Sequence, residues 1–296
     1  MEIKGIIVAM VSPFDEHGEL RSNAYRRLLD RVIDAGVDGV FVNGSQGEFF
    51  SLTADERNRA LELSVEHVAG RVAVYAGVGA VTTREAVELT RAAESIGCDA
   101  VSALTPYFIN LTDEELGEHY QAIAAATKLP VLLYGNPART GQRVSVELVR
   151  ELARVENIAG IKDSSGDLSL TDAYIRATAD ADFSVIAGRD TLIYATLAYG
   201  GAGSIAATGN VAAHLAVRIY RAVRNGDHEQ ARAAQRELAP LRETFGLGSF
   251  PVVIKEAVRM MGYDLGLSMP PIGPMSEAAR EELRGLLDRM GLLGGA

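Results

Sequence analysis

The sequence lacks most of the features that mark secreted, membrane or metal-binding proteins. Cys98 is the only cysteine among 296 residues, which excludes an intrachain disulfide framework and a thiolate metal cluster. No uninterrupted apolar stretch is long enough to span a bilayer. The first residues lack the charged and apolar regions of a signal peptide. We therefore expect a soluble, cytoplasmic protein in which Cys98 is a small core residue.

Positive charge is also scarce. The sequence has 29 Lys and Arg residues against 39 Asp and Glu, so the net charge is −10. This balance argues against nucleic acids and anionic membranes as partners. It does not exclude an anionic small molecule, because local Lys, Arg and backbone N–H groups set the field inside a pocket.

Signals for metals and cofactors are weak. The segment Gly77-Val78-Gly79-Ala80 is an incomplete dinucleotide fingerprint and predicts no nucleotide cofactor. The histidines show no ligand spacing; they are His17, His67, His119, His214 and His228. We therefore expect neither a metal ion nor a cofactor.

Short apolar runs alternate with helical segments over most of the chain. The predicted strands are Ile6–Val11, Gly39–Val42, Val72–Ala76, Ala100–Ala103, Val131–Tyr134, Ala159–Lys162, Ser184–Ala187 and Ala202–Ile205. Between them, amphipathic patterns predict helices at Tyr25–Ala35, Ala54–Val68, Thr83–Ile96, Asp113–Ala125 and Val146–Val155. This alternation favours parallel pairing with right-handed crossovers and an α/β fold, a closed (β/α)8 TIM barrel.

Cap signals support several of these helices. Thr53 followed by Glu56 and Thr112 followed by Glu115 match the capping-box pattern. Ser22 stands before the first predicted helix and is expected to cap it.

The alternation stops at the turn signal Asn225-Gly226-Asp227. Beyond it, His228–Leu241, Phe250–Met261 and Ser276–Met290 are helical in pattern. The sequence thus predicts a catalytic barrel over residues 1–224 and a C-terminal helical region over 225–296, a small three-helix appendage packed on the barrel.

Lys162 is the most informative residue. It ends the apolar run that begins at Ile158 and precedes a polar segment. The charged form of a lysine is poorly solvated in such a place, which favours a neutral amine able to attack a carbonyl. A second interpretation keeps the stem in the strand while the ammonium reaches water or a carboxylate such as Asp163.

Other unusual side chains also follow predicted strands, and in a barrel these ends meet at one mouth. Tyr134 and Lys162 end neighbouring strands, so a phenol is expected beside the amine, where it can relay protons. The backbone N–H groups of the loop Gly44–Glu48 can face a carboxylate. Arg139 can hold a second carboxylate with two hydrogen bonds. Core packing for the tyrosine and a surface or subunit contact for the arginine are the alternatives.

Three motifs together are similar to those of the dihydrodipicolinate synthase / N-acetylneuraminate lyase family. They are Gly44-Ser45-Gln46-Gly47-Glu48, Tyr134-x-x-Pro137 with Arg139-Thr140-Gly141, and Gly160-Ile161-Lys162-Asp163-Ser164. The likeness spans essentially the whole chain, including the C-terminal helices. It implies a pyruvate-type class I lyase or aldolase on a barrel, usually a tetramer.

The resemblance also implies roles for individual residues. Lys162 would form the Schiff base, and Tyr134 would donate and accept the proton. Ser45 is the third catalytic candidate; with Gln46 it would hold the α-carboxylate and feed the relay. The remaining substrate-binding candidates are Gly47, Tyr107, Arg139, Gly188 and Ile205.

Departures from the family pattern bear on the substrate. Gln46 stands where Thr or Gly is usual, and Gly135 replaces a polar residue. Phe108 occupies the place of a tyrosine that completes a hydroxyl relay in the neighbouring subunit of the synthases. Arg139 favours a synthase-like or dicarboxylate substrate over sialic acid. Cleavage, condensation or dehydration of a 2-keto-3-deoxy acid or hydroxy-oxo-diacid is the reaction class expected.

Two other functions remain open at this point. A keto-acid-binding protein without turnover would explain the lost hydroxyl at Phe108. A phosphate-handling barrel isomerase would use the glycines after the seventh and eighth strands as an anion site, but it leaves Lys162 and Tyr134 without a role.

Overall fold

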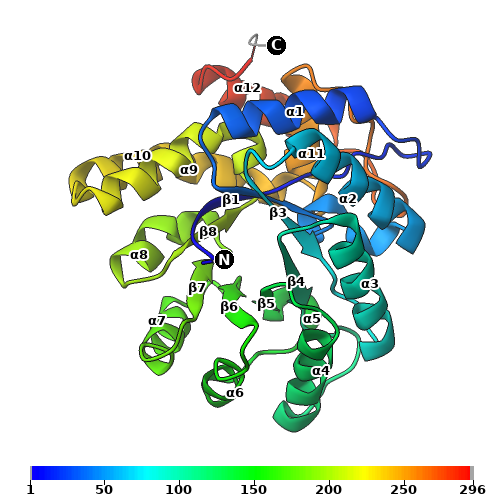
Figure 1. Cartoon of the computed structure of the whole chain (residues 1–296). Coiled ribbons are helices and arrows are strands. Elements are labelled where there is room, and N and C mark those ends of the chain that lie inside the picture. Colours follow the sequence, from blue (N-terminus) through cyan, green and yellow to red (C-terminus); the bar gives the residue numbers. More distant parts are fainter. Residues whose placement is uncertain (1, 294–296) are drawn as a thin grey trace.

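The computed structural model describes residues 2–293 and forms a closed barrel of parallel strands surrounded by helices (Figure 1). The strands are β1 Gly5–Ala9, β2 Gly39–Val42, β3 Ala73–Gly77, β4 Ala100–Leu104, β5 Val131–Gly135, β6 Ile158–Asp163, β7 Ser184–Ala187 and β8 Gly203–Ala206. They pair in chain order, and β8 closes on β1. The predicted TIM barrel is confirmed, with each strand within two residues of its expected bounds.

The helices that surround the barrel follow the strands in turn. They are α1 Ser22–Asp34, α2 Ala54–Val68, α3 Thr83–Ile96, α4 Asp113–Ala125, α5 Pro137–Thr140, α6 Val146–Leu152, α7 Leu168–Ala177, α8 Ile193–Ala198 and α9 Gly209–Arg224. Short 3-10 turns lie at η1 Ser45–Gly47, η2 Phe49–Ser51 and η3 Asp190–Leu192. The first four and α6 match predicted segments, whereas α7, α8 and α9 were not among the predicted ranges.

Two of the three predicted helix caps are present. Thr53 and Glu56 form a complete capping box at α2, and Thr112 and Glu115 form another at α4. The prediction for Ser22 is wrong, because Ser22 is the first residue of α1 and the residue before it makes no side-chain cap. The backbone N–H of Arg21 instead donates to the Pro13 carbonyl in an irregular loop, and this long-range contact cannot be read from a local pattern.

Side chains on each strand point alternately into the barrel and toward the helices, so the hydrophobic core has two layers. One layer fills the barrel and includes Ile7, Phe41, Leu132, Ile186 and Ile205. The other lies between strands and helices. Because neighbours on a strand face opposite sides, Ile161 joins the outer layer, and Lys162 next to it projects into the barrel.

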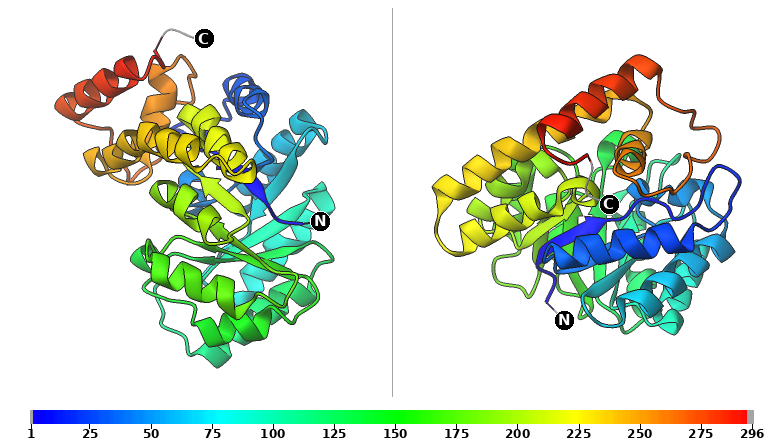
Figure 2. Two further views of the ribbon diagram at one scale, coloured as in Figure 1. Left: turned by 90° about the vertical axis from the view of Figure 1, so that its left-hand side faces the viewer. Right: turned by 90° about the horizontal axis from the view of Figure 1, so that it is seen from above.

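The C-terminal helices pack on one side of the barrel, beside α9 (Figure 2). They are α10 His228–Glu243, α11 Val252–Met260 and α12 Glu277–Arg289, with the 3-10 turn η4 Thr244–Leu247 between the first two. The predicted three-helix appendage is confirmed. No helix of the described chain is both long and apolar enough to cross a membrane. Cys98 is a buried free thiol.

Candidate active site

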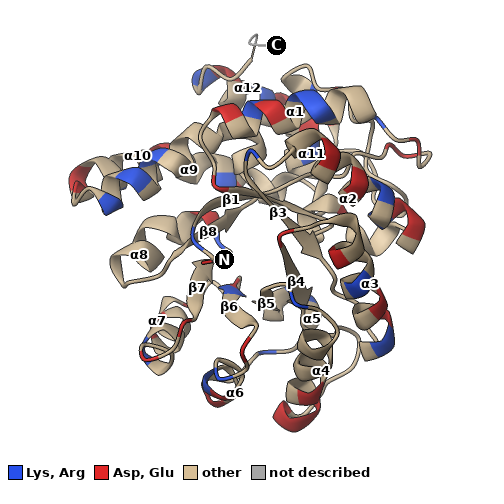
Figure 3. Ribbon diagram, in the orientation of Figure 1, with Lys and Arg blue, Asp and Glu red and all other residues tan. Residues whose placement is uncertain are grey.

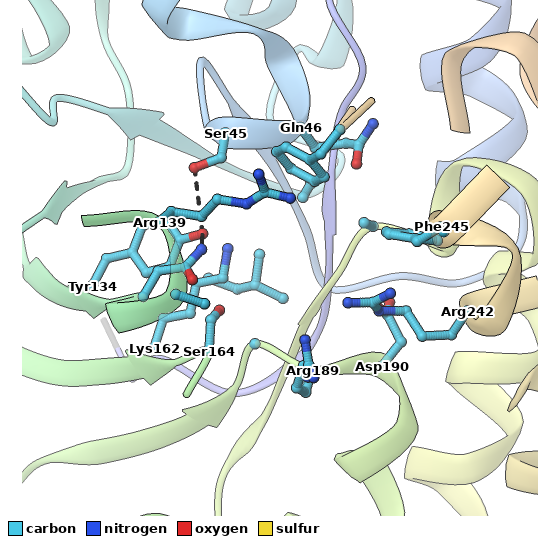
Figure 4. Close-up of a pocket in the computed structure, with 18 residues that line it drawn as sticks. Ser45, Gln46, Tyr134, Arg139, Lys162, Ser164, Arg189, Asp190, Arg242 and Phe245 are labelled. Carbon is cyan, nitrogen blue, oxygen red and sulfur yellow. Dashed lines mark hydrogen bonds and ion pairs between the residues drawn. The ribbon is translucent and has the colours of Figure 1, made fainter. Parts of the chain in front are cut away.

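A cavity of about 410 Å³ lies at the carboxyl-terminal mouth of the barrel (Figure 4). Seven of the predicted site residues line it together: Ser45, Gln46, Tyr134, Arg139, Lys162, Gly188 and Ile205. They come from β5, β6, β8 and the loops after β2, β5 and β7. The barrel topology therefore gathers side chains that are far apart in the sequence, as expected for strand ends that share one mouth.

Lys162 is buried to 4 % exposure, and its surroundings are aromatic. Tyr134 is its direct partner in the β5–β6 register. The Lys162 Nζ atom lies 4.0 Å from the centroid of the Tyr134 ring and 5.0 Å from that of Phe41. Among the residues described, no carboxylate lies within ion-pair distance of this amine. Lys162 is thus held against two rings at the mouth, without a counter-ion.

Asp163 does not act as the partner that the second interpretation assigned to Lys162. It follows Lys162 on the strand and points to the opposite face of the sheet. One carboxylate oxygen accepts from the Ser165 N–H at 2.9 Å and the other from the Thr171 hydroxyl at 2.6 Å. Asp163 therefore fixes α7 against the barrel and leaves the amine free inside.

Tyr134 has an unusual electrostatic environment. Its hydroxyl lies 3.4 Å from Ser45 Oγ and accepts from Asn136 Nδ2 at 3.2 Å. Burial by itself raises the pKa of Tyr134, but the charge of Lys162 and hydrogen bonds from Ser45, Asn136 and Ser164 outweigh it, so that the pKa lies below its usual value. A phenol that loses its proton more readily than usual is suited to proton transfer.

The loop after β2 is held by its own contacts to the C-terminal region. Gln46 Nε2 donates to the Pro251 carbonyl at 3.1 Å. Glu48 is buried, accepts from Lys255 Nζ at 3.0 Å and also accepts the Met269 N–H at 3.1 Å. In the described structure, the backbone N–H groups of Ser45 and Gln46 donate to no protein acceptor. They are available to a ligand at the cavity.

Arg139 and Gly188 frame two other walls. The Arg139 guanidinium lies 4.4 Å from the centroid of the Phe250 ring, and no acidic side chain of residues 2–293 pairs with it. Gly188 follows β7, and a Cβ at this position would collide with the Ser164 hydroxyl. Glycine is therefore required for the close approach of β7 to β6 at the cavity.

Two predicted site residues lie outside this cavity. Gly47 is buried at the end of η1, where a Cβ would come within 3.1 Å of the Met10 carbonyl. Tyr107 is half-buried, stacks edge-on against Phe49 and lines an adjoining cavity that Ser45 and Arg139 share. Burial and the nearby Glu85 raise the pKa of Tyr107. Phe108, next to it, is 95 % exposed.

Several residues of the cavity were missed at the sequence level. They are Ala9, Asn136, Ala138, Ser164, Arg189, Asp190, Ala207, Arg242, Phe245, Gly246 and Phe250. Asn136, Ser164, Arg189 and Asp190 immediately follow strand ends, which is a signal that could have identified them. Arg242 and Phe245 belong to α10 and η4, and no local pattern connects them with a strand end. The described residues include no group of three or more His, Cys, Asp or Glu side chains placed to hold a metal ion.

Comparison with known proteins places the chain in a well-populated group. The model of the dihydrodipicolinate synthetase family matches residues 2–290. The chain is similar to a 4-hydroxy-tetrahydrodipicolinate synthase of Methanopyrus kandleri, with 38 % identity over 294 residues that cover 99 % of this chain and 98 % of the relative. It is also similar to an uncharacterised DapA-like lyase of Halobacterium salinarum, with 36 % identity over 98 % of this chain and 95 % of the relative.

A solved structure supports the same relationship. A prophage protein of the dihydrodipicolinic acid synthase family from E. coli K12, crystallised in complex with pyruvate, superposes with a TM-score of 0.94. Its sequence identity is 34 %, and the match covers 98 % of this chain and 99 % of that one.

Proposed function

The chain belongs to the dihydrodipicolinate synthetase family of class I lyases, and we propose that it forms a Schiff base between Lys162 and pyruvate or a related 2-oxo acid. The observation that carries this proposal is the position of Lys162. Its amine is buried at the barrel mouth, without an acidic partner in the described chain and 4.0 Å from the Tyr134 ring centroid.

The first step joins this amine to the substrate. Once Lys162 Nζ has given up its ammonium proton, its lone pair attacks the keto carbon, a C–N bond forms, and the electrons of the carbonyl double bond move to oxygen. That oxygen takes up protons and leaves as water, which gives a protonated imine. Because the imine nitrogen is cationic, it can accept the electrons of an adjacent C–C or C–H bond, and no metal ion is required for this role.

Tyr134 is placed to move the protons in these steps. Its hydroxyl is bonded to Ser45 and Asn136, and its pKa is below the usual range. We assign to Tyr134 the protonation of the departing hydroxyl and the later transfer at the substrate carbon. Ser45 is assigned the relay of protons to and from the phenol.

The α-carboxylate is assigned to the loop after β2. The free N–H groups of Ser45 and Gln46 provide donors, and Lys162 and Tyr134 lie on the same side of the cavity as Ser45 (Figure 4). Ile205 supplies an apolar wall of the cavity. Gly188, which has no side chain, leaves room beside Ser164. This arrangement binds the acid group while leaving the keto carbon next to the amine.

Two residues around the proposed Schiff-base site support a narrower substrate class. Phe108 has no hydroxyl for the relay that its position supplies in the synthases, and Arg139 offers a cation at the cavity. We propose cleavage or dehydration of a 2-keto-3-deoxy acid or hydroxy-oxo-diacid, in preference to condensation with aspartate semialdehyde. Assembly as a homo-oligomer, a tetramer by family resemblance, and the division at residues 224 and 225 remain predictions.

Borohydride trapping tests the proposal. Incubation with pyruvate and borohydride should add one reduced pyruvyl group, which peptide mass spectrometry should locate on Lys162. Lys255, which is equally buried, is the internal control and should stay unmodified. Absence of an adduct on Lys162 would falsify the proposal. A panel of 2-keto-3-deoxy acids, aspartate semialdehyde and sialic acid, assayed for pyruvate release or consumption, then identifies the reaction.

A further inference from the structure

The far side of the cavity carries more positive charge than the proposed chemistry requires. Arg189 and Arg242 line the cavity opposite Ser45 and Lys162, and Asp190 is the only acidic side chain among the residues that line it (Figure 4). The protein as a whole has a net charge of −10, and outer helices such as α2, α3 and α4 carry acidic residues (Figure 3). A cationic wall inside an acidic protein indicates a ligand with negative charge at that end.

Arg189 lies beyond the reacting centre along the barrel axis. Ile186 is the register partner of Lys162 on β7, and Arg189 follows it by three residues in extended conformation. This step corresponds to roughly 10 Å of chain. The Arg189 guanidinium packs on the backbone of Gly166 and has no hydrogen-bond or ion-pair partner among the residues described. Its donors are therefore available to a ligand.

Arg242 reaches the same wall from α10. Its guanidinium stacks 4.0 Å from the centroid of the Phe245 ring, and its Nε lies 3.5 Å from Asp190 Oδ2. The other carboxylate oxygen of Asp190 accepts from the N–H and the hydroxyl of Thr208, which fixes the acid in place. Burial lowers the pKa of Arg242, opposed by Asp190, and the charges of Arg189 and Arg139 lower it further. The arginines are thus close enough to repel one another, and an anion between them would relieve that repulsion.

We propose that Arg189 and Arg242 form a second anion subsite that binds an acidic group at the distal end of the 2-oxo acid substrate. The distal group is a carboxylate or a phosphate, which both suit the fork of donors that a guanidinium presents. The inference rests on the proposed Schiff base at Lys162, because that bond fixes the keto end of the substrate. It deepens the proposal by giving the substrate two anionic ends.

The test compares 2-oxo acids that differ only at the far end. The probes are 2-oxoadipate, 2-oxohexanoate of the same length without a distal charge, the matching 2-oxo acid that ends in a phosphate, and pyruvate. For each, the concentration that half-saturates borohydride-trapped adduct on Lys162 is measured by intact mass. The proteins are wild type, Arg189→Gln, Arg242→Gln and the control Arg236→Gln, which removes an exposed charge from the same helix as Arg242.

We expect wild type to half-saturate with 2-oxoadipate or the phosphate-ended acid at a concentration about tenfold lower than with 2-oxohexanoate. Arg189→Gln and Arg242→Gln should each reduce that preference to about twofold or less, and Arg236→Gln should keep it. Half-saturation by pyruvate, which has no distal group, should change by less than about twofold in every variant. The more strongly preferred end group identifies the ligand as a carboxylate or a phosphate.

No preference in wild type, or an equal preference in Arg189→Gln and wild type, overturns the subsite. Arg189→Gln decides the matter if Arg242→Gln fails to fold, because Arg189 has no described partner that its loss would leave unpaired. If wild type forms no adduct with any acid, the Schiff-base proposal fails by itself. Calorimetric binding of 2-oxoadipate then tests the subsite directly: weaker binding to Arg189→Gln supports it, and equal binding overturns it.

Discussion

Two lysines of this protein are almost equally buried, at 4 % exposure for Lys162 and 1 % for Lys255, but their surroundings are opposite. Lys255 donates to Glu48 at 3.0 Å and to the Phe14 carbonyl at 2.6 Å. Lys162 faces the rings of Tyr134 and Phe41 and opens on the cavity. Burial therefore does not separate the lysine proposed to react from the structural one, whereas the partners of the two side chains do.

The two lysines differ because one amine is held in an ion pair and the other is not. Burial lowers the pKa of Lys255, and Glu48 opposes that change, so this amine is committed to an ion pair that ties α11 to the loop after β2. Removing one partner of a buried ion pair is strongly destabilising, because it leaves the other charge buried without a counter-ion. Lys162 has no ion-pair partner in the described chain, and its charge lowers the pKa of Tyr134 instead.

Replacing Lys162, the proposed Schiff-base lysine, should have the largest effect. Lys162→Met is expected to abolish the pyruvate adduct and to lower kcat by about 10³-fold or more, because the nucleophile is removed. The free energy of unfolding should not fall, since no ion pair is broken. Adduct mass, steady-state kinetics and urea unfolding measure the three quantities. A large loss of stability would show that Lys162 is a structural residue.

Replacing the structural lysine should have the reverse effect. Lys255→Met leaves Glu48 buried without a counter-ion, and the free energy of unfolding should fall by about 3 to 5 kcal/mol. The folded fraction should still form the adduct on Lys162. The double variant Glu48→Gln with Lys255→Met is the matched control and should recover part of the loss in urea unfolding. An unchanged stability in Lys255→Met would contradict the role assigned to the pair.

The pKa of Tyr134 also distinguishes Lys162 from Lys255, with a smaller expected effect. Its pKa lies below the usual value, with Lys162 the larger of the lowering causes and Ser45 the next. Lys162→Met should therefore raise the pKa of Tyr134 more than Ser45→Ala does, and Lys255→Met should not change it. Ultraviolet titration of tyrosinate, with Tyr134→Phe subtracted, isolates this group. Because the deprotonated form gains stability from Lys162, its ionisation should move to higher pH when Lys162 is removed.

The smallest effect concerns the second link between the loop and the C-terminal region. Gln46→Met removes the hydrogen bond to the Pro251 carbonyl, and the free energy of unfolding should fall by about 1 kcal/mol or less. Replacement also removes Gln46 Oε1, a buried acceptor that no donor of the described chain reaches, which offsets part of the loss. Urea unfolding of Gln46→Met and Lys255→Met, measured side by side, compares the two links. If Gln46→Met lowers the free energy of unfolding as much as Lys255→Met does, the hydrogen bond is not the weaker link.

Most of the barrel and much of the candidate site could be predicted from local sequence. Strand periodicity located Tyr134 and Lys162 at neighbouring strand ends, and the observed register pairs these two residues. Helix starts were predicted where a side chain caps its own helix, as at Thr53. The prediction failed at Ser22, where Arg21 before α1 is bonded to the preceding loop at Pro13 and Asp15. Gly47 and Tyr107 were also predicted for the site; neither lines the main cavity, and Tyr107 lines the adjoining one, a distinction that the local sequence does not make.

The amino-acid order by itself determined the alternation of strands and helices, and with it the mouth at which Lys162, Tyr134 and Ser45 meet, because periodicity and strand ends are local properties. Only the tertiary structure decided what lies around them. It gave Asp163 the Thr171 hydroxyl as a partner, paired Glu48 with Lys255, and brought Arg242 from α10 opposite the amine. Partners of a charge are chosen by packing between segments far apart in the chain, and no local pattern records that choice.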